Sequence, residues 1–263
     1  MRRLLFFCLA LAACAPSAPE GPQGEADALA LVDRLRDRHG VDALDRAEVA
    51  FSFRGTPFTA RREGSQFRYA RVLTDEDGQR VEEVVDNAGV HRFVDGAEVE
   101  LAEDEAGRVH TAVNSVVYFA LLPYALTDPA VRVRTLGPDS VGGAAYDRLE
   151  ATFAQEGGGA DWDDRYVYWI RQPDGTGAGA TLDFLAYSYA TTPGDTSRNE
   201  TGVRFREVLG TRDVGGVRFQ NYRNLTADSL GPRDLERFGE LYDAGRTRTV
   251  SDVVLDSIRV RPL

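Results

Sequence analysis

Side chains that could carry out catalysis are few and scattered in this chain of 263 residues. The 3 histidines, His39, His91 and His110, show no metal-ligand spacing such as HExxH. All 31 basic residues are arginine, which excludes a Schiff-base lysine and a Walker lysine. No GxSxG motif of a nucleophile elbow is present. We therefore predict a protein that is not an enzyme and needs no cofactor. A hydrolase based on paired carboxylates stays as an alternative, because folding can pair Asp and Glu without a sequence signature.

An acidic cluster is the one candidate for a metal site. Asp161, Asp163 and Asp164 lie close together in the sequence GADWDDRY, and alternating carboxylates suit Ca²⁺. The stretch lacks the central glycine and the terminal glutamate of a calcium-binding loop. We expect a solvated acidic turn here and no metal site.

Net charge limits the choice of partners. The formal charge is −11, with 42 acidic against 31 basic residues. Binding to nucleic acid normally needs a basic surface, as does electrostatic attachment to phospholipids. We therefore predict no nucleic-acid partner, and any membrane contact must come from another source.

Aromatic and aliphatic side chains are the remaining functional signal. Many aromatic residues alternate along segments with strand character, which is typical of a sheet core. The alternative is a cavity between a curved sheet and a helix, lined by these side chains and able to hold an apolar ligand. The candidate lining residues are Phe51, Phe53, Tyr69, Val117, Tyr118, Phe119, Trp169, Phe184 and Tyr187.

The N-terminal segment predicts export and lipid attachment. Two arginines precede the apolar run Leu4–Ala13, which is too short to span a bilayer as a helix. The run ends in LAAC, which resembles the lipobox of a bacterial lipoprotein precursor. The resemblance implies a signal peptide over residues 1–13 and acylation of Cys14, which would anchor the protein in the cell envelope, facing the periplasm from the outer membrane. An ordinary secretory signal, cleaved near Ala15 or Ala18, is the alternative.

The rest of the chain predicts one mainly β domain. Residues 14–25 are rich in Pro, Gly and Ala and are expected to form a flexible tether, which leaves residues 26–263 as the domain. Ala26–His39 and Val109–Leu122 show helical spacing of apolar residues, and a shorter helix is expected within Pro232–Ala244. Elsewhere apolar residues alternate between short turns. This pattern predicts a single, strongly curved antiparallel sheet of roughly nine to twelve strands wrapped around the Val109–Leu122 helix.

Local sequence similarity agrees with this architecture. The stretches Val113–Val131, Leu182–Thr191 and Gly202–Asn224 resemble an uncharacterised family of exported bacterial proteins, a domain of unknown function. The order of elements is similar to the half-barrel of the lipoprotein carriers LolA and LolB. The resemblance implies an envelope location and a LolA-like half-barrel, and it carries no catalytic residue.

Together these features predict an envelope lipoprotein that binds a lipid or a lipoprotein acyl chain in the concavity of its sheet. The Val109–Leu122 helix would then act as a lid. The competing hypothesis is an envelope scaffold with a filled core, whose partners bind its acidic outer surface.

Overall fold

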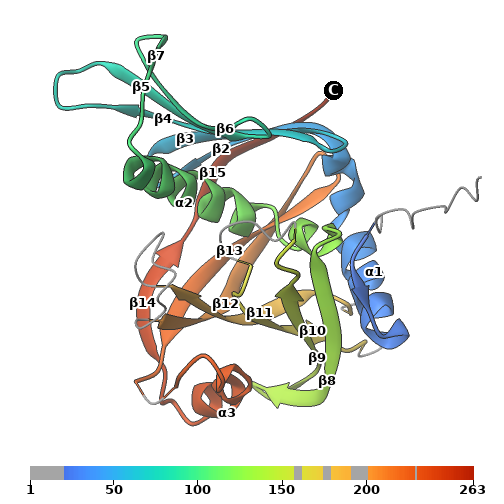
Figure 1. Ribbon diagram of the computed structural model, residues 1–263. Helices are drawn as coiled ribbons and strands as arrows, with labels where there is room; N and C mark the ends of the chain where they lie inside the picture. Colours follow the sequence, from blue (N-terminus) through green and yellow to red (C-terminus); the bar gives the residue numbers. More distant parts are fainter. Residues whose placement is uncertain (1–20, 157–161, 174–178, 191–200, 229) are drawn as a thin grey trace, which may run out of the picture.

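The computed structural model describes residues 21–156, 162–173, 179–190, 201–228 and 230–263. Within these residues the chain is mainly β, with fifteen strands and three α-helices. The strands form two sheets, one above the other in Figure 1, and helix α2 (Glu103–Ala120) crosses the space between them.

The upper sheet is antiparallel and has seven strands in the order β15-β2-β3-β4-β5-β6-β7. Val49, Phe51, Phe58 and Ala60 are buried on the face that packs against α2, and polar residues alternate with them. The strands are β2 (Arg46–Phe53), β3 (Thr56–Glu63), β4 (Gln66–Thr74), β5 (Arg80–Asp86), β6 (Gly89–Val94), β7 (Ala97–Val99) and β15 (Leu255–Pro262).

The lower sheet is mixed and has eight strands in the order β1-β8-β9-β10-β11-β12-β13-β14. Only the two-residue β1 runs parallel to its neighbour, β8. The strands are β1 (Gln23–Gly24), β8 (Val131–Val141), β9 (Ala144–Phe153), β10 (Tyr166–Arg171), β11 (Leu182–Ala190), β12 (Thr201–Val214), β13 (Val217–Thr226) and β14 (Arg248–Val253).

The prediction of a single sheet with at most twelve strands is therefore wrong. Among the described elements the chain changes sheet three times: between β1 and β2, between β7 and β8, and at Val254 between β14 and β15. Strongly twisted sheets rarely grow beyond about ten strands without splitting into packed layers. Charged residues interrupt the alternation of apolar side chains in several strands, as in the RVEEVVD of β5, and so hide their strand character in the sequence.

The helices lie near the predicted places. Helix α1 (Ala26–His39) packs Ala28, Leu31 and Leu35 onto the lower sheet. It ends at Gly40, whose φ of 64° is left-handed, and a Cβ there would come within 2.0 Å of the Gly216 carbonyl oxygen. Glycine is required at this position by both the backbone conformation and the close approach.

Helix α2 begins earlier than predicted and is buried on two sides. Val113 and Val117 pack against the upper sheet, whereas Phe119 packs toward the lower one. Helix α2 therefore lies between apolar side chains of the two sheets. No described helix is both long enough and apolar enough to cross a membrane.

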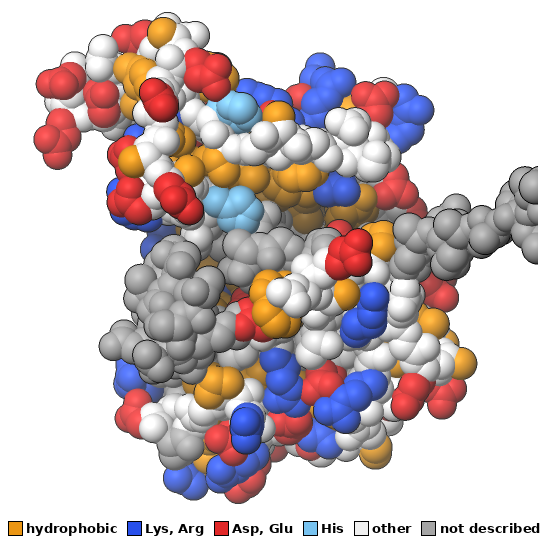
Figure 2. Space-filling view, in the orientation of Figure 1, with side chains coloured by type: hydrophobic (Ala, Val, Ile, Leu, Met, Phe, Trp, Pro, Cys, Tyr) orange, Lys and Arg blue, Asp and Glu red, His pale blue; other side chains and the backbone are white. Residues whose placement is uncertain are grey.

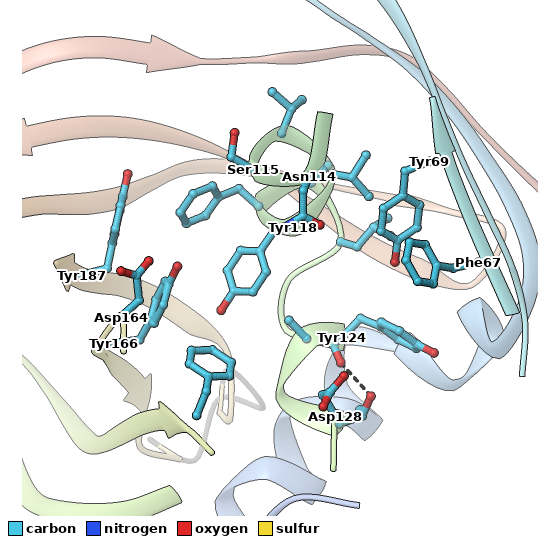
Figure 3. A pocket seen from close by; sticks show the side chains of 18 of the residues that line it. Phe67, Tyr69, Asn114, Ser115, Tyr118, Tyr124, Asp128, Asp164, Tyr166 and Tyr187 are labelled. Atoms are coloured by element: carbon cyan, nitrogen blue, oxygen red, sulfur yellow. Dashed lines mark hydrogen bonds between the residues drawn. The ribbon is translucent and has the colours of Figure 1, made fainter. Parts of the chain in front are cut away.

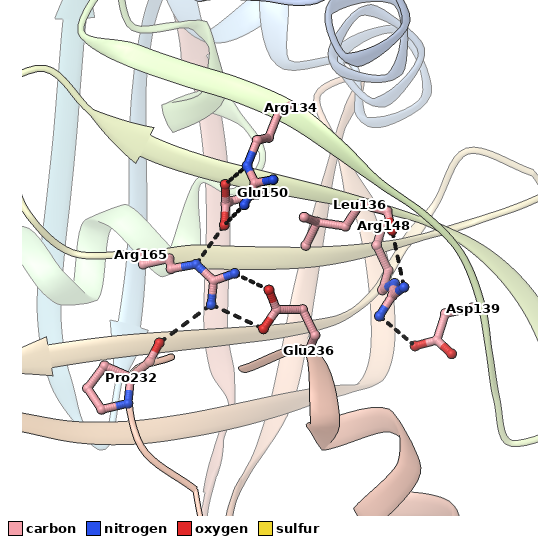
Figure 4. A network of polar contacts seen from close by, with 8 residues as sticks. All are labelled: Arg134, Leu136, Asp139, Arg148, Glu150, Arg165, Pro232 and Glu236. Carbon is pink, nitrogen blue, oxygen red and sulfur yellow. Dashed lines mark hydrogen bonds and ion pairs between the residues drawn. The ribbon is translucent and has the colours of Figure 1, made fainter. Parts of the chain in front are cut away.

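The third helical segment covers the opposite face of the lower sheet. A 3₁₀ turn (Leu235–Arg237) leads into α3 (Phe238–Asp243). Figure 4 shows how Arg165 fastens this segment to the sheet: it pairs with Glu236 and, at 2.6 Å, with the buried Glu150, which also binds Arg134. The buried carboxylate of Glu150 is thus compensated by two cations.

Candidate functional site

A large hollow lies between the two sheets. Its volume is about 1500 Å³, and α2, the 3₁₀ turn η2 (Tyr124–Thr127) and strands of both sheets line it. Figure 2 shows hydrophobic side chains gathered in the recessed band beneath the upper sheet. Ligand pockets commonly occupy about 300–1000 Å³, so the hollow is large enough for a long apolar molecule.

Helix α2 contributes aromatic rings to the hollow. Tyr118 projects from α2 toward Tyr166 of the lower sheet, as Figure 3 shows, and their ring centroids are 5.4 Å apart. Phe119 lies 5.0 Å from Tyr187, measured between ring centroids. The helical positions 118 and 119 face the lower sheet because positions 113 and 117 are held by the upper one.

The lower sheet supplies the opposite aromatic surface. Tyr166 of β10 and Tyr187 of β11 are cross-strand partners, and their rings stack at 5.6 Å with an interplanar angle of 13°. Phe153 meets Tyr166 edge-on at 5.9 Å, and Tyr189 lies 5.8 Å from Tyr187. These rings form a continuous apolar surface with hydroxyl groups at intervals.

Tyr118 and Tyr168 form a hydrogen-bonded pair of phenols between α2 and the lower sheet. The hydroxyls of Tyr118 and Tyr168 lie 3.1 Å apart. Burial raises the pKa of both tyrosines well above the usual value, so both hydroxyls stay neutral. Tyr118, which lines the hollow, therefore adds no charge to it, and Tyr168 lies buried behind it.

Arg206 brings a full charge to the lower side of the hollow. Its side chain lines the cavity although the residue is only 7% exposed. The guanidinium carbon lies 3.4 Å from the centroid of the Phe119 ring and 5.3 Å from that of Tyr187, and Nη2 donates to the Tyr187 hydroxyl at 3.1 Å. Nε and Nη1 have no hydrogen-bond partner in the part of the chain that the structure describes.

The upper side of the hollow also carries polar side chains. Arg62 donates to the Tyr69 hydroxyl and stacks over the Tyr124 ring at 4.7 Å. Tyr124 in turn donates to Asp45 at 2.8 Å, and burial raises the pKa of Tyr124 to about 12. Nε of Arg62 has no hydrogen-bond partner among the described residues, whereas two nitrogens of Arg206 have none.

Six of the nine predicted lining residues lie at the hollow: Phe53, Tyr69, Val117, Tyr118, Phe119 and Tyr187. The structure places the other three elsewhere. Phe51 is buried against Phe58 within the core of the upper sheet. Trp169 and Phe184 lie on the far face of the lower sheet, beneath α3.

The alternation of side chains could have separated these groups. Along β11, Phe184 and Tyr187 stand an odd number of residues apart and so point to opposite faces of the strand. Both faces of this strand are buried, however, so hydrophobicity alone does not show which one borders a hollow.

Sequence reasoning missed Arg206, because arginine is common in this chain and nothing in the pattern marks a buried one. Its place in β12 carries some signal, since Arg204 and Arg206 alternate with Val203 and Phe205. That alternation predicts one apolar and one basic face. It does not predict that the basic face would be covered.

The acidic cluster lies beside the hollow. Asp163 and Asp164 both line it, while Asp161 falls outside the described residues, as does Cys14. The three histidines are on separate elements: His39 ends α1, His91 lies in β6 and His110 lies in α2. Among the described residues no group of three or more His, Cys, Asp or Glu side chains could hold a metal ion.

Comparison with solved structures finds proteins of low sequence identity that cover 60% to 88% of this chain. A DUF1329 family protein from Desulfovibrio piger is 13% identical, with 88% of this chain and 92% of that chain covered and a TM-score of 0.37. An outer-membrane lipoprotein-sorting protein domain from Vibrio parahaemolyticus is 9% identical, with 88% and 93% covered and a TM-score of 0.41. Lipoprotein LppX of Mycobacterium tuberculosis is 16% identical, with 60% and 87% covered and a TM-score of 0.25.

Comparison at the level of sequence gives a family and no individual relative. A search of curated proteins finds no match. The model of a family of unknown function, DUF6503, matches residues 58–254, which include helix α2 and most of the residues that line the hollow. This confirms the resemblance to an uncharacterised family, and the chain belongs to the DUF6503 family.

Proposed function

We propose that this protein is a lipid-anchored protein of the bacterial envelope that binds an apolar ligand, a lipid or a lipoprotein acyl chain, between its two sheets. The observation that carries the proposal is the hollow of about 1500 Å³ faced with aromatic rings. A scaffold with a filled core has no reason to keep such a space, because protein interiors normally pack densely.

The lining suits a long chain. Contiguous rings on β10, β11 and α2 offer apolar contact over an extended surface. Burying apolar area stabilises a complex by roughly 25 cal/mol per Å², which favours ligands with many methylene groups. The neutral phenol of Tyr118, which lines the hollow, would tolerate such a chain without the cost of desolvating a charge.

Ligand uptake tests the proposal directly. Native mass spectrometry of the purified protein is expected to show a discrete added mass from a co-purifying lipid. After delipidation, a fluorescent fatty acid is expected to bind with an increase in emission. If no adduct and no uptake are seen, the protein does not bind lipid and the scaffold hypothesis replaces this one.

A substitution that fills the hollow sharpens the test. Ser115 of α2 lines the hollow, and Ser115→Trp is expected to reduce uptake roughly tenfold or more by occupying ligand space. The matched control is Arg108→Trp, which adds the same side chain at an exposed position of the same helix. Equal uptake by the two variants would contradict a ligand in the hollow.

Membrane attachment is proposed separately, through Cys14. Growth with a labelled fatty acid is expected to label the protein covalently, and Cys14→Ser is expected to abolish the label. Undiminished labelling of the Ser variant would show that the lipobox interpretation is wrong, whatever the outcome of the uptake experiments.

A further inference from the structure

We infer that the ligand of the hollow carries a single negative charge, a carboxylate at one end of its apolar chain, and that Arg206 binds this carboxylate. The inference rests on the proposed function and specifies the chemistry of its ligand.

The first argument is the imbalance of charge around Arg206. No carboxylate in the described part of the chain forms an ion pair with this guanidinium, although the residue is only 7% exposed. Two buried carboxylates, by contrast, are each paired with two arginines: Glu83 binds Arg71 and Arg92, and Glu150 binds Arg134 and Arg165. A buried charge without a counter-charge is unfavourable, so an anion from outside the chain would stabilise this site.

The second argument is the set of free donors. Nε and Nη1 of Arg206 lack acceptors, and both belong to a side chain that borders the hollow. The Tyr187 hydroxyl accepts its hydrogen bond from Nη2, which leaves the phenolic proton available to a second acceptor. A carboxylate has two oxygens and could receive hydrogen bonds from both residues.

The third argument concerns the size of the charge. One uncompensated cation matches one carboxylate, whereas a phosphate monoester carries about 1.5 to 2 negative charges at neutral pH. Arg204, the neighbouring cation on this face of β12, lies over the Tyr189 ring and donates to the Val203 carbonyl oxygen. The immediate surroundings of the Arg206 guanidinium are the rings of Phe119, Tyr187 and Tyr222. These rings would contact the first methylene groups of a chain attached to the carboxylate.

The test compares two ligands that differ only at the head. Hexadecanoate and hexadecanol are offered to the delipidated full chain at pH 8, where the acid is ionised, and each displaces the same fluorescent probe. The wild type is expected to bind hexadecanoate roughly tenfold or more tightly than the alcohol, since a charge-assisted hydrogen bond replaces a neutral one. Hexadecyl phosphate in a third arm is expected to bind no better than hexadecanoate.

Two variants locate the preference. Arg206→Met replaces the guanidinium with an apolar side chain of similar length. The variant protein is expected to lose the preference for the acid and to bind the alcohol as before. Arg212→Met is the matched control, because Arg212 lies exposed on the same strand and away from the hollow. Unfolding curves of both variants check that the fold is intact.

The outcomes separate the inference from the proposed function. If neither ligand binds the wild type, the proposed function fails. If the acid and the alcohol bind equally well, or if Arg206→Met weakens both equally, the ligand hollow stands and the anion site is refuted. A clear preference for the phosphate would also refute the carboxylate assignment.

Discussion

The two faces of the lower sheet are made from the same strands and differ in what covers them. On the face under α3, Trp169, Phe184 and Phe205 pack with Phe238 into a closed core. On the other face, Tyr166 and Tyr187 stack with equal regularity and border a hollow. Aromatic richness is therefore no measure of filling. The two faces differ in the element that covers them. Helix α3 packs directly on one face, whereas α2, which covers the other face, packs mainly against the upper sheet.

The polar groups follow the same division. Tyrosine dominates on the hollow face and phenylalanine and tryptophan on the closed face. A hydroxyl is costly in a packed core without a partner and harmless where a cavity or a neighbouring phenol receives it. Along β10 and β11 the choice between Tyr and Trp or Phe thus marks the face that stays open. Strand β9 is the exception, with Tyr146 on the closed face and Phe153 at the hollow.

The largest expected difference between the faces is in stability. Phe205→Ala removes a ring with no exposure from the closed core and is expected to lower the free energy of unfolding by about 3–5 kcal/mol. Tyr189→Ala, on the hollow face and half-buried, is expected to cost about 1 kcal/mol. Urea unfolding curves of the two variants measure both values, and equal losses would show that the hollow face is as tightly packed as the other.

The second largest expected effect is a loss of stability in acid, which arises at the C-terminal end of α1. His39 is buried there, and Nε2 accepts a hydrogen bond from the Leu182 amide at 3.4 Å. Burial, together with the charge of Arg218, lowers the pKa of His39 to about 4, against 6.5 for an unperturbed histidine. Because the folded state binds this proton more weakly, the stabilisation is complete above pH 6.5 and declines as the pH falls toward 4.

The full loss corresponds to about 3 kcal/mol, since each pKa unit is worth about 1.4 kcal/mol. The free energy of unfolding, measured from pH 7 to pH 4, is compared with that of His39→Gln, which cannot titrate. The variant is expected to have a shallower dependence on pH. Identical slopes would mean that His39 is protonated equally easily in both states.

Phe119→Glu sharpens the comparison at a single position. In a filled core a new carboxylate would prevent folding, but at the hollow it would stand beside the unpaired Arg206. We expect a folded protein that is destabilised by about 1–2 kcal/mol and no longer prefers an acidic ligand, because the carboxylate occupies the guanidinium. Phe205→Glu on the closed face is the control and is expected not to fold. Failure of both variants to fold would argue against the hollow.

The smallest expected effect comes from the phenol pair. Tyr118→Phe removes the hydrogen bond to the Tyr168 hydroxyl and is expected to cost about 1 kcal/mol of unfolding free energy. Tyr242→Phe removes a hydrogen bond of 2.8 Å to Glu207, whose side chain is 24% exposed and can bind water instead, and is expected to cost less. Thermal unfolding of the two variants checks this order, and the reverse order would place the pair in contact with water.

Local patterns predicted much of the fold. The helical spacing of Ala26–His39 depends on neighbours along the chain, and α1 lies over that predicted range. Alternation between short turns likewise predicted a mainly β chain. The β5 strand was missed because Glu82 and Glu83 interrupt its alternation, and Glu83 is buried only by virtue of Arg71 and Arg92 on the strands beside it. A residue whose burial depends on partners from other strands leaves no local signal.

Some features of the candidate site follow from the local sequence, and others depend on the tertiary structure. The sequence by itself determined the apolar character of α2, the aromatic strands and the absence of lysine-based chemistry, because these are properties of residue type and spacing. Only the tertiary structure decided that the sheet splits in two, that α2 stands between the layers, and that Arg206 is enclosed with free donors. Enclosure depends on which layer covers a strand face, and strands buried on both faces read alike in sequence.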